Sequence, residues 1–218
     1  MTFSMKSTNN LDFDLFHGSS SIFLNSIYEN GFGYRDNEIF DKEVFEKLKA
    51  ALFSFKGISK YWQEMECFLE CISEGQGRFS YEGVYFTPSR NNALTYAENN
   101  YGSEYLSTIH DMYQDLKLHD LAAAEIIINS NSKLANIFRQ VHRPILVIYR
   151  NAAVSDLWVE KGKTEEDVFA QLTEMDSTFQ KLKERSGIPE ERIKEIVWQQ
   201  DTFICKRILS VDEILIET

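Results

Sequence analysis

The alternation of apolar and polar positions predicts a short strand followed by a helix near the start of the chain. Residues 12–16, DFDLF, alternate over most of their length, which is typical of a strand with one buried face, and we expect the strand to end at His17. Residues 19–30 carry apolar side chains at helical spacing. Residues 31–33, Gly-Phe-Gly, should stop that helix, because glycine commonly ends helices.

Longer helical patterns fill the middle of the chain. Residues 38–73 repeat apolar positions at helical intervals, with a break near Gly57, and we interpret them as an inserted helical element. Residues 84–87 form a brief apolar run that is typical of a strand. We expect residues 91–99 and most of residues 104–139 to be helical.

The last third of the chain mixes both kinds of pattern. Residues 145–149, ILVIY, predict a fully buried strand, and residues 164–185 predict an amphipathic helix with an acidic first turn. Residues 201–205 are expected to form a strand, and residues 210–216 a closing segment. Because the strands alternate irregularly with helices, the sequence predicts an α+β fold, with residues 1–218 forming one domain that carries the helical insertion.

Composition and charge limit the classes of protein. The chain has 218 residues with 43% hydrophobic and 13% aromatic side chains, which favours a globular protein with a substantial core. Its net charge is −11 and its pI is about 4.9. An acidic surface disfavours non-specific binding to DNA or anionic lipid. It does not exclude a nucleic-acid substrate, because an acidic protein can carry a local basic groove. Without an apolar run of membrane-spanning length or a signal-peptide core, we expect a soluble, cytoplasmic protein.

The cysteines and one glycine-rich segment carry little chemistry. Cys67, Cys71 and Cys205 lack the paired spacing of a zinc site, so we expect no metal and a reducing compartment. Residues 75–80, GQGRFS, resemble part of a kinase glycine-rich loop. They lack the flanking strand and the lysine that a phosphate cradle needs, so we interpret them as a turn.

Two separated segments carry the strongest chemical pattern. Residues 15–19 read LFHGS, and residues 82–89 read EGVYFTPS, with Tyr96 eleven positions after Tyr85. Together these segments resemble the diphtheria-toxin and poly(ADP-ribose) polymerase branch of the ADP-ribosyltransferases, whose signature is His, Tyr and a third residue that is usually Glu. The resemblance implies a split β-sheet core with inserted helices and implies NAD as the co-substrate.

The resemblance also implies a role for each matching residue. Nicotinamide is a flat ring with an amide group, so it suits a slot between aromatic faces that also offers backbone hydrogen bonds. The resemblance assigns the walls of the slot to Tyr85 and Tyr96, and the amide contacts to the backbone of Gly18. It implies that His17 forms a hydrogen bond with a ribose hydroxyl in the adenosine half of NAD, and that Ser19 could contribute to this contact.

The third position departs from the family pattern. The family places a carboxylate at the start of a late strand, where it holds a hydroxyl of the nicotinamide ribose and stabilises the oxocarbenium-like transition state. No Glu stands there in this chain, and Asp201 lies two residues before Phe203. Gln200 and Gln199 are alternatives that could bind ribose without supplying negative charge, and Asp201 could equally be an ordinary strand-end residue. The predicted catalytic residues are His17, Tyr85, Asp201 and Gln200.

The resemblance implies a mono-ADP-ribosyltransferase that modifies a protein or a nucleic acid, similar to bacterial toxins of toxin–antitoxin or anti-phage systems. An antitoxin or inhibitor protein would then be a partner, with residues 38–73 as a contact surface. Other outcomes stay open: hydrolysis of NAD, an RNA 2′-phosphotransferase-like reaction, or a catalytically silent module that binds NAD or docks a partner. His110, His119 and His142 have no informative spacing, and we interpret them as surface or packing residues.

Overall fold

A computed structural model describes most of the chain and divides it into two compact units. The described residues are 9–36, 38–39, 42–62, 83–99 and 101–218. The first unit comprises Met1–Tyr34, Glu82–Asn99 and Arg143–Thr218, and the second comprises Arg35–Tyr81 and Asn100–His142. Helices combine with two small antiparallel sheets, so the predicted α+β class is confirmed. The prediction of one domain with a helical insertion stays a prediction.

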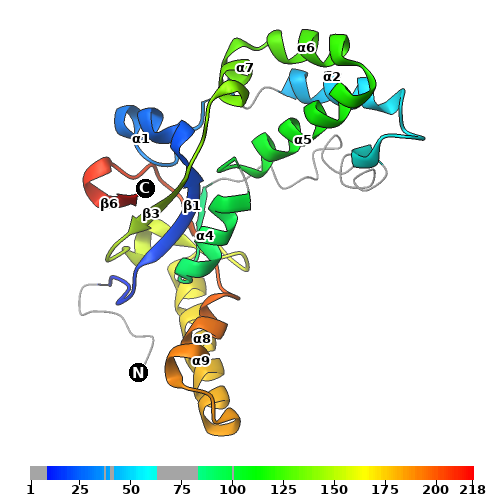
Figure 1. The fold of residues 1–218 in the computed structure, drawn as a ribbon. Coiled ribbons are helices and arrows are strands. Elements are labelled where there is room, and N and C mark those ends of the chain that lie inside the picture. The colour runs from blue at the N-terminus through cyan, green and yellow to red at the C-terminus, as the bar shows by residue number, and fades with distance from the viewer. Residues whose placement is uncertain (1–8, 37, 40–41, 63–82, 100) are drawn as a thin grey trace. The chain divides into compact units, whose positions relative to one another are not determined.

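The first unit contains both sheets (Figure 1). One sheet has the strand order β1-β3-β6, formed by Leu15–Ser20, Pro144–Tyr149 and Ile214–Glu217. The other has the order β2-β5-β4, formed by Val84–Phe86, Phe203–Cys205 and Leu157–Trp158. An antiparallel bridge between Phe16 and Thr87 joins β1 to β2, with N–O distances of 2.8 and 2.9 Å. The end of β2 therefore lies beside the start of β1.

Strand β1 begins and ends later in the chain than its side-chain pattern predicts. The expected end at His17 is wrong, because the strand continues through Gly18 and Ser19 to Ser20. Its backbone pairs with β3 along the whole length, and Gly18 lies opposite Leu146. The His-Gly-Ser sequence therefore lies within β1 and not in a loop after the strand, because pairing with β3 continues through these residues.

Helix α4, Arg90–Asn99, covers one face of the β1-β3-β6 sheet (Figure 1). Ala93 packs there against Leu146 and Ile148, and Phe16 lies at the edge of this cluster. The opposite face of the sheet contributes side chains to the main core. Phe86, from the other sheet, belongs to the same core. Burial of Phe86 and its neighbours between these elements supplies the hydrophobic stabilisation of the first unit. The predicted helix at 91–99 and the predicted strand at 145–149 are both confirmed.

A helical hairpin completes the first unit. Helix α8, Glu165–Ser186, has the acidic first turn that the sequence predicts, and it begins with a capping box between Thr164 and Asp167. Gly187 ends the helix with a φ of 61°, in the left-handed region that favours glycine. Helix α9, Glu190–Trp198, then runs beside α8 (Figure 1). The sequence pattern did not predict α9. A short helix, α1, at Leu24–Asn30 ends at Gly31 as expected. The predicted helix start at residue 19 is wrong, because Ser19 and Ser20 pair with β3 as part of β1 and residues 21–23 form a 3-10 turn.

The second unit is helical in its described part. It contains α2, α5, α6 and α7, which are Lys42–Phe53, Glu104–His119, Leu121–Asn129 and Ser132–Arg139. The range 104–139 is mostly helical, as predicted, and is divided into α5, α6 and α7. Asp120 and Asn131 cap α6 and α7, because each side chain accepts a hydrogen bond from a backbone N–H group in the first turn. A turn follows α2 around Gly57. The remainder of the predicted insertion, from residue 63 to residue 73, lies outside the described residues.

Candidate functional site

His17 lies on β1 among aromatic rings from separate segments. Its ring centroid is 5.0 Å from that of Phe32 and 5.9 Å from that of Phe86. Its Nδ1 atom is 2.6 Å from the carbonyl oxygen of Tyr85. A carbonyl oxygen only accepts hydrogen bonds, so Nδ1 carries the proton. Burial lowers the pKa of His17 while the hydrogen bond to Tyr85 opposes this shift, and the net effect favours a neutral ring with Nε2 as an acceptor.

Three of the predicted donor-site residues meet here from three elements. Tyr85 lies on β2 opposite Ile204 of β5, and its carbonyl reaches His17. Tyr96 lies on α4, and its ring centroid is 6.3 Å from that of His17. Because Phe86 points into the core, alternation along β2 directs the Tyr85 side chain to the other face of the strand. The structure thus brings together the His17 ring, the Tyr85 backbone and the Tyr96 ring.

Gly18 and Ser19 are both buried in the strand beside His17. A Cβ atom at Gly18 would lie 1.9 Å from the carbonyl oxygen of Ala93 and 2.8 Å from the backbone nitrogen of Ala97. The missing side chain of Gly18 therefore allows α4 to approach β1. Ser19 is 3% exposed and pairs with Ile145 of β3. Their predicted contacts with NAD stay predictions.

Asp201 lies in a different environment, between α9 and β5. Burial raises the pKa of its carboxyl group to about 6, the negative charge of Glu174 adds to this rise, and Lys161 opposes it. Glu174 belongs to α8, whereas Lys161 lies in the segment before that helix. Gln200 and Gln199 are both exposed. The structure therefore groups the predicted third position with α8 and α9.

Sequence reasoning missed a polar cluster around Glu195 of α9. Its Oε1 atom accepts hydrogen bonds from Ser89 Oγ at 2.5 Å, Gln199 Nε2 at 3.3 Å and Asn91 Nδ2 at 3.5 Å. Ser89 is fully buried and also accepts a hydrogen bond from the backbone N–H of Asn92, which makes it the N-cap of α4. The sequence indicates that Pro-Ser begins α4. It does not indicate that Ser89 donates to Glu195, because Glu195 lies more than a hundred positions away in the chain.

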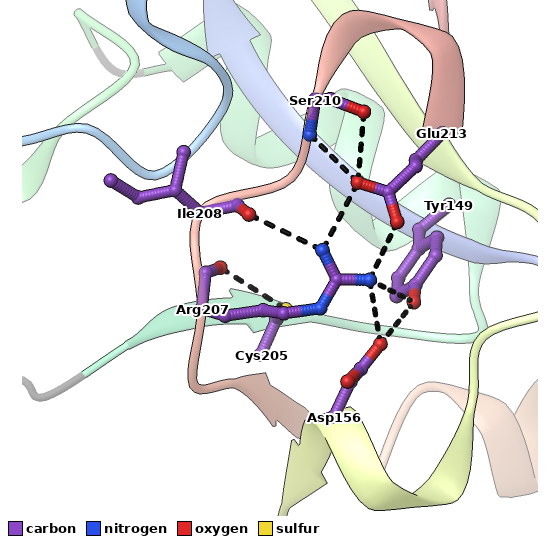
Figure 2. Close-up of polar contacts among 7 residues, drawn as sticks. All are labelled: Tyr149, Asp156, Cys205, Arg207, Ile208, Ser210 and Glu213. Carbon is purple, nitrogen blue, oxygen red and sulfur yellow. Dashed lines mark hydrogen bonds and ion pairs between the residues drawn. The ribbon is translucent and has the colours of Figure 1, made fainter.

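A second polar cluster joins the two sheets around Arg207 (Figure 2). The guanidinium donates to Glu213 at 2.6 and 3.0 Å and to Asp156 at 2.8 Å. Asp156 also accepts a hydrogen bond from the hydroxyl of Tyr149 on β3 at 2.8 Å. The hydrogen bonds from Arg207, assisted by the Ser210 backbone, lower the pKa of Glu213 to about 2. Two carboxylates thus neutralise Arg207, and this arrangement supports a role in holding the fold.

The remaining candidates give no further chemical centre in the described part. Among the described residues, no group of three His, Cys, Asp or Glu side chains is placed to hold a metal ion. Cys67, Cys71 and the glycine-rich residues 75–80 lie outside the described residues. Cys205 is buried with a free thiol. His119 stacks on Phe55, as expected for a packing residue.

No helix in the described ranges has the length and apolar character needed to cross a membrane. Comparisons with protein-family models, curated proteins and solved structures found no match to this chain. The interpretation of the site therefore depends on the residues of this chain and on their geometry.

Proposed function

We propose that this chain is an ADP-ribosyltransferase that cleaves the nicotinamide–ribose bond of NAD and transfers ADP-ribose to a macromolecule. The observation that best supports this is the convergence of His17, Tyr85 and Tyr96 from β1, β2 and α4. His17 is distant in sequence from Tyr85 and Tyr96, and all three belong to the pattern that resembles the family. The two three-stranded sheets joined between Phe16 and Thr87 are compatible with the split-sheet core of that family.

The proposed donor site uses the neutral ring of His17. With Nδ1 donating to Tyr85, Nε2 is left to accept a hydrogen bond from a ribose hydroxyl of the adenosine half. Aromatic rings close by, including that of Tyr96, suit the flat nicotinamide. Ionisable groups of this kind, with shifted pKa values and aromatic neighbours, mark candidate functional sites.

The proposed reaction breaks one bond and forms one. The bond between the anomeric carbon and the pyridinium nitrogen breaks, and both of its electrons go to that nitrogen, which gives neutral nicotinamide. The positive charge that develops on the ribose is stabilised by a group that holds a ribose hydroxyl, for which Asp201 or Gln200 is predicted. A nucleophile of the acceptor then attacks the anomeric carbon and loses its proton to solvent.

The acceptor is proposed to be a protein or a nucleic acid, in a toxin or anti-phage role that an antitoxin would restrain. Incubating the protein with adenylate-labelled NAD and cell extract, followed by separate protease and nuclease digestion, identifies the class of acceptor. Label that survives protease and is lost with nuclease identifies a nucleic acid. The opposite pattern identifies a protein, and label that never enters a macromolecule supports hydrolysis of NAD.

Release of nicotinamide from NAD in the presence of cell extract tests the proposed activity. Tyr85→Ala should slow release at least about tenfold, because it removes a wall of the proposed slot. Tyr28→Ala is the matched control, since Tyr28 is 60% exposed on α1. Equal rates for wild type and Tyr85→Ala would contradict the proposed site.

A second candidate function is a module that binds NAD without cleaving it. The environment of Asp201 favours this candidate, because burial and the negative charge of Glu174 raise its pKa and so disfavour the ionised carboxylate that cleavage would use. Calorimetric titration with NAD separates the two functions. Binding of NAD by wild type without any release of nicotinamide, with extract present, would favour the binding module.

A further inference from the structure

Three side chains of the β2-β5-β4 sheet share one face. Tyr85 pairs with Ile204, and Ile204 pairs with Trp158, in antiparallel register. Side chains that lie directly opposite each other in an antiparallel sheet are on the same face, so Trp158 is on the face that carries Tyr85. Two strand spacings separate these positions, which is about 10 Å. All three side chains are half-buried, so this face of the sheet is partly open to solvent.

The backbone brings two lysines to the ring of Trp158. A tight turn after β4 pairs Val159 with Gly162 through backbone hydrogen bonds of 3.1 and 3.2 Å. The chain therefore returns Lys163 to a position beside Trp158. Lys206 directly follows β5, the strand that pairs with β4. The Nζ atoms of Lys163 and Lys206 are 4.8 and 5.9 Å from the centroid of the Trp158 ring, within the range of cation–π attraction.

The chemistry of this aromatic and basic cluster indicates the kind of ligand that it suits. A nucleobase stacks on the flat face of an indole, and ammonium groups beside the ring attract the phosphates on either side of that base. Bases in a duplex already stack on one another, so a single strand suits the cluster better. The whole chain carries a net charge of −11, so this attraction is confined to the neighbourhood of Trp158.

We propose that Trp158, Lys163 and Lys206 bind a single-stranded nucleic acid, with one base stacked on the indole and the adjacent phosphates paired with the lysines. Both lysines are exposed, so their ammonium groups can move from the ring to the phosphates as the base stacks. This binding requires no NAD. That the bound strand is the acceptor of ADP-ribose rests on the proposed function, and the position of Tyr85 on the same face supports it.

Fluorescence anisotropy of labelled oligothymidylate and oligouridylate, each of about 12 nucleotides, tests the proposal without NAD. We expect wild type to bind at least one of these strands, and to bind a duplex of equal length more weakly. The two strands distinguish DNA from RNA as the ligand. Trp158→Ala should weaken binding at least about fivefold, the effect typical of losing one stacked base. Trp158→Phe keeps a flat ring and should weaken binding less.

The salt dependence of binding tests the role of the two lysines. Replacing both Lys163 and Lys206 by Gln removes two phosphate contacts. The slope of log affinity against log salt concentration should then become less steep by about 1.4, because each contact with a single strand contributes about 0.7. Replacing both Lys181 and Lys194 by Gln is the matched control, since it changes the net charge equally at positions on α8 and α9. This control should keep the wild-type slope.

The possible outcomes are distinct. Failure of wild type to bind either single strand would overturn the proposal, and so would equal affinities in wild type and Trp158→Ala. If Trp158→Ala does not fold, the lysine variants decide, and an unchanged salt slope would overturn the proposal. Displacement of the oligonucleotide by polyglutamate at equal charge concentration would identify an acidic peptide as the ligand instead. Intact oligonucleotide binding without release of nicotinamide in cell extract would overturn only the proposed function.

Discussion

The backbone of Ala93 on α4 lies directly against Gly18 on β1, where a Cβ atom at Gly18 would be 1.9 Å from the Ala93 carbonyl oxygen. Real Cβ atoms essentially never lie so close to another heavy atom, and here the neighbour is helix backbone that cannot rotate away. The glycine next to His17 is thus a requirement of the contact between α4 and β1. It fixes the distance between the strand that carries His17 and the helix that carries Tyr96.

Gly18→Ala should therefore destabilise the first unit. We expect a loss of at least about 2–3 kcal/mol in the free energy of unfolding, the upper range for overpacking a core. Urea unfolding followed by circular dichroism measures it. Gly57→Ala is the control, because a Cβ at Gly57 meets nothing within 4 Å. Equal midpoints for the two variants would contradict the close approach of α4 to β1.

His17 should be a neutral imidazole with its proton on Nδ1. Its pKa is lowered by burial, so we expect it to titrate below the ordinary value of 6.5. The stability that this neutral ring contributes is present above pH 6.5 and is lost as the pH falls through its lowered pKa. Nitrogen-15 NMR of labelled histidine distinguishes the tautomers. A proton on Nε2 at neutral pH would be inconsistent with the hydrogen bond to Tyr85.

Arg207→Ala should cost about 2–3 kcal/mol of unfolding free energy, because it leaves the carboxylates of Asp156 and Glu213 without their cation. Lys206→Ala, which removes the neighbouring exposed cation, should change stability by less than about 0.5 kcal/mol. The pKa of Glu213 is lowered to about 2, so its contribution is present above 4.5 and is lost as the pH falls toward 2. Denaturant unfolding at neutral and acidic pH measures both effects, and an unchanged midpoint in Arg207→Ala would refute the role of the network.

Asp201→Asn should stabilise the protein at neutral pH. The pKa of Asp201 in the fold is about 6, above the ordinary 3.8, so wild type loses stability as the pH rises through this window. The full shift corresponds to about 3 kcal/mol, and solvent screening at this half-buried side chain reduces it to about 1 kcal/mol. Unfolding midpoints of both proteins at about pH 4 and about pH 8 test this. A variant that is less stable than wild type at the higher pH would show that the Asp201 charge is stabilised in the fold.

The sequence predicted the elements that have strong periodicity and clear end signals. The apolar strand at Pro144–Tyr149 and the capped helix at Glu165–Ser186 lie where they were expected. Helix α9 was missed because it is short and follows closely after the proline that ends the α8 pattern. The end of β1 was wrong because pairing with β3, which no local pattern records, extends the strand to Ser20.

The candidate site was predictable only in part, for a similar reason. His17, Tyr85 and Tyr96 were found because their order and spacing resemble a known pattern, and the structure brings them together. Glu195 has no such signal, because its partners at Ser89 and Asn91 are far away in the sequence. Only the folded chain places the carboxylate beside the capped end of α4.

Release of nicotinamide from NAD by wild type, His17→Ala and His110→Ala tests the central claim most directly. His17 lies at the proposed donor site, whereas His110 packs against Tyr101 in the second unit. With cell extract as the source of acceptor and with matched thermal midpoints, we expect wild type and His110→Ala to release nicotinamide at equal rates. His17→Ala should be slower by at least about tenfold, because it loses the acceptor for a ribose hydroxyl. Equal rates in all three proteins, or no release by wild type, would contradict an NAD-cleaving site at His17.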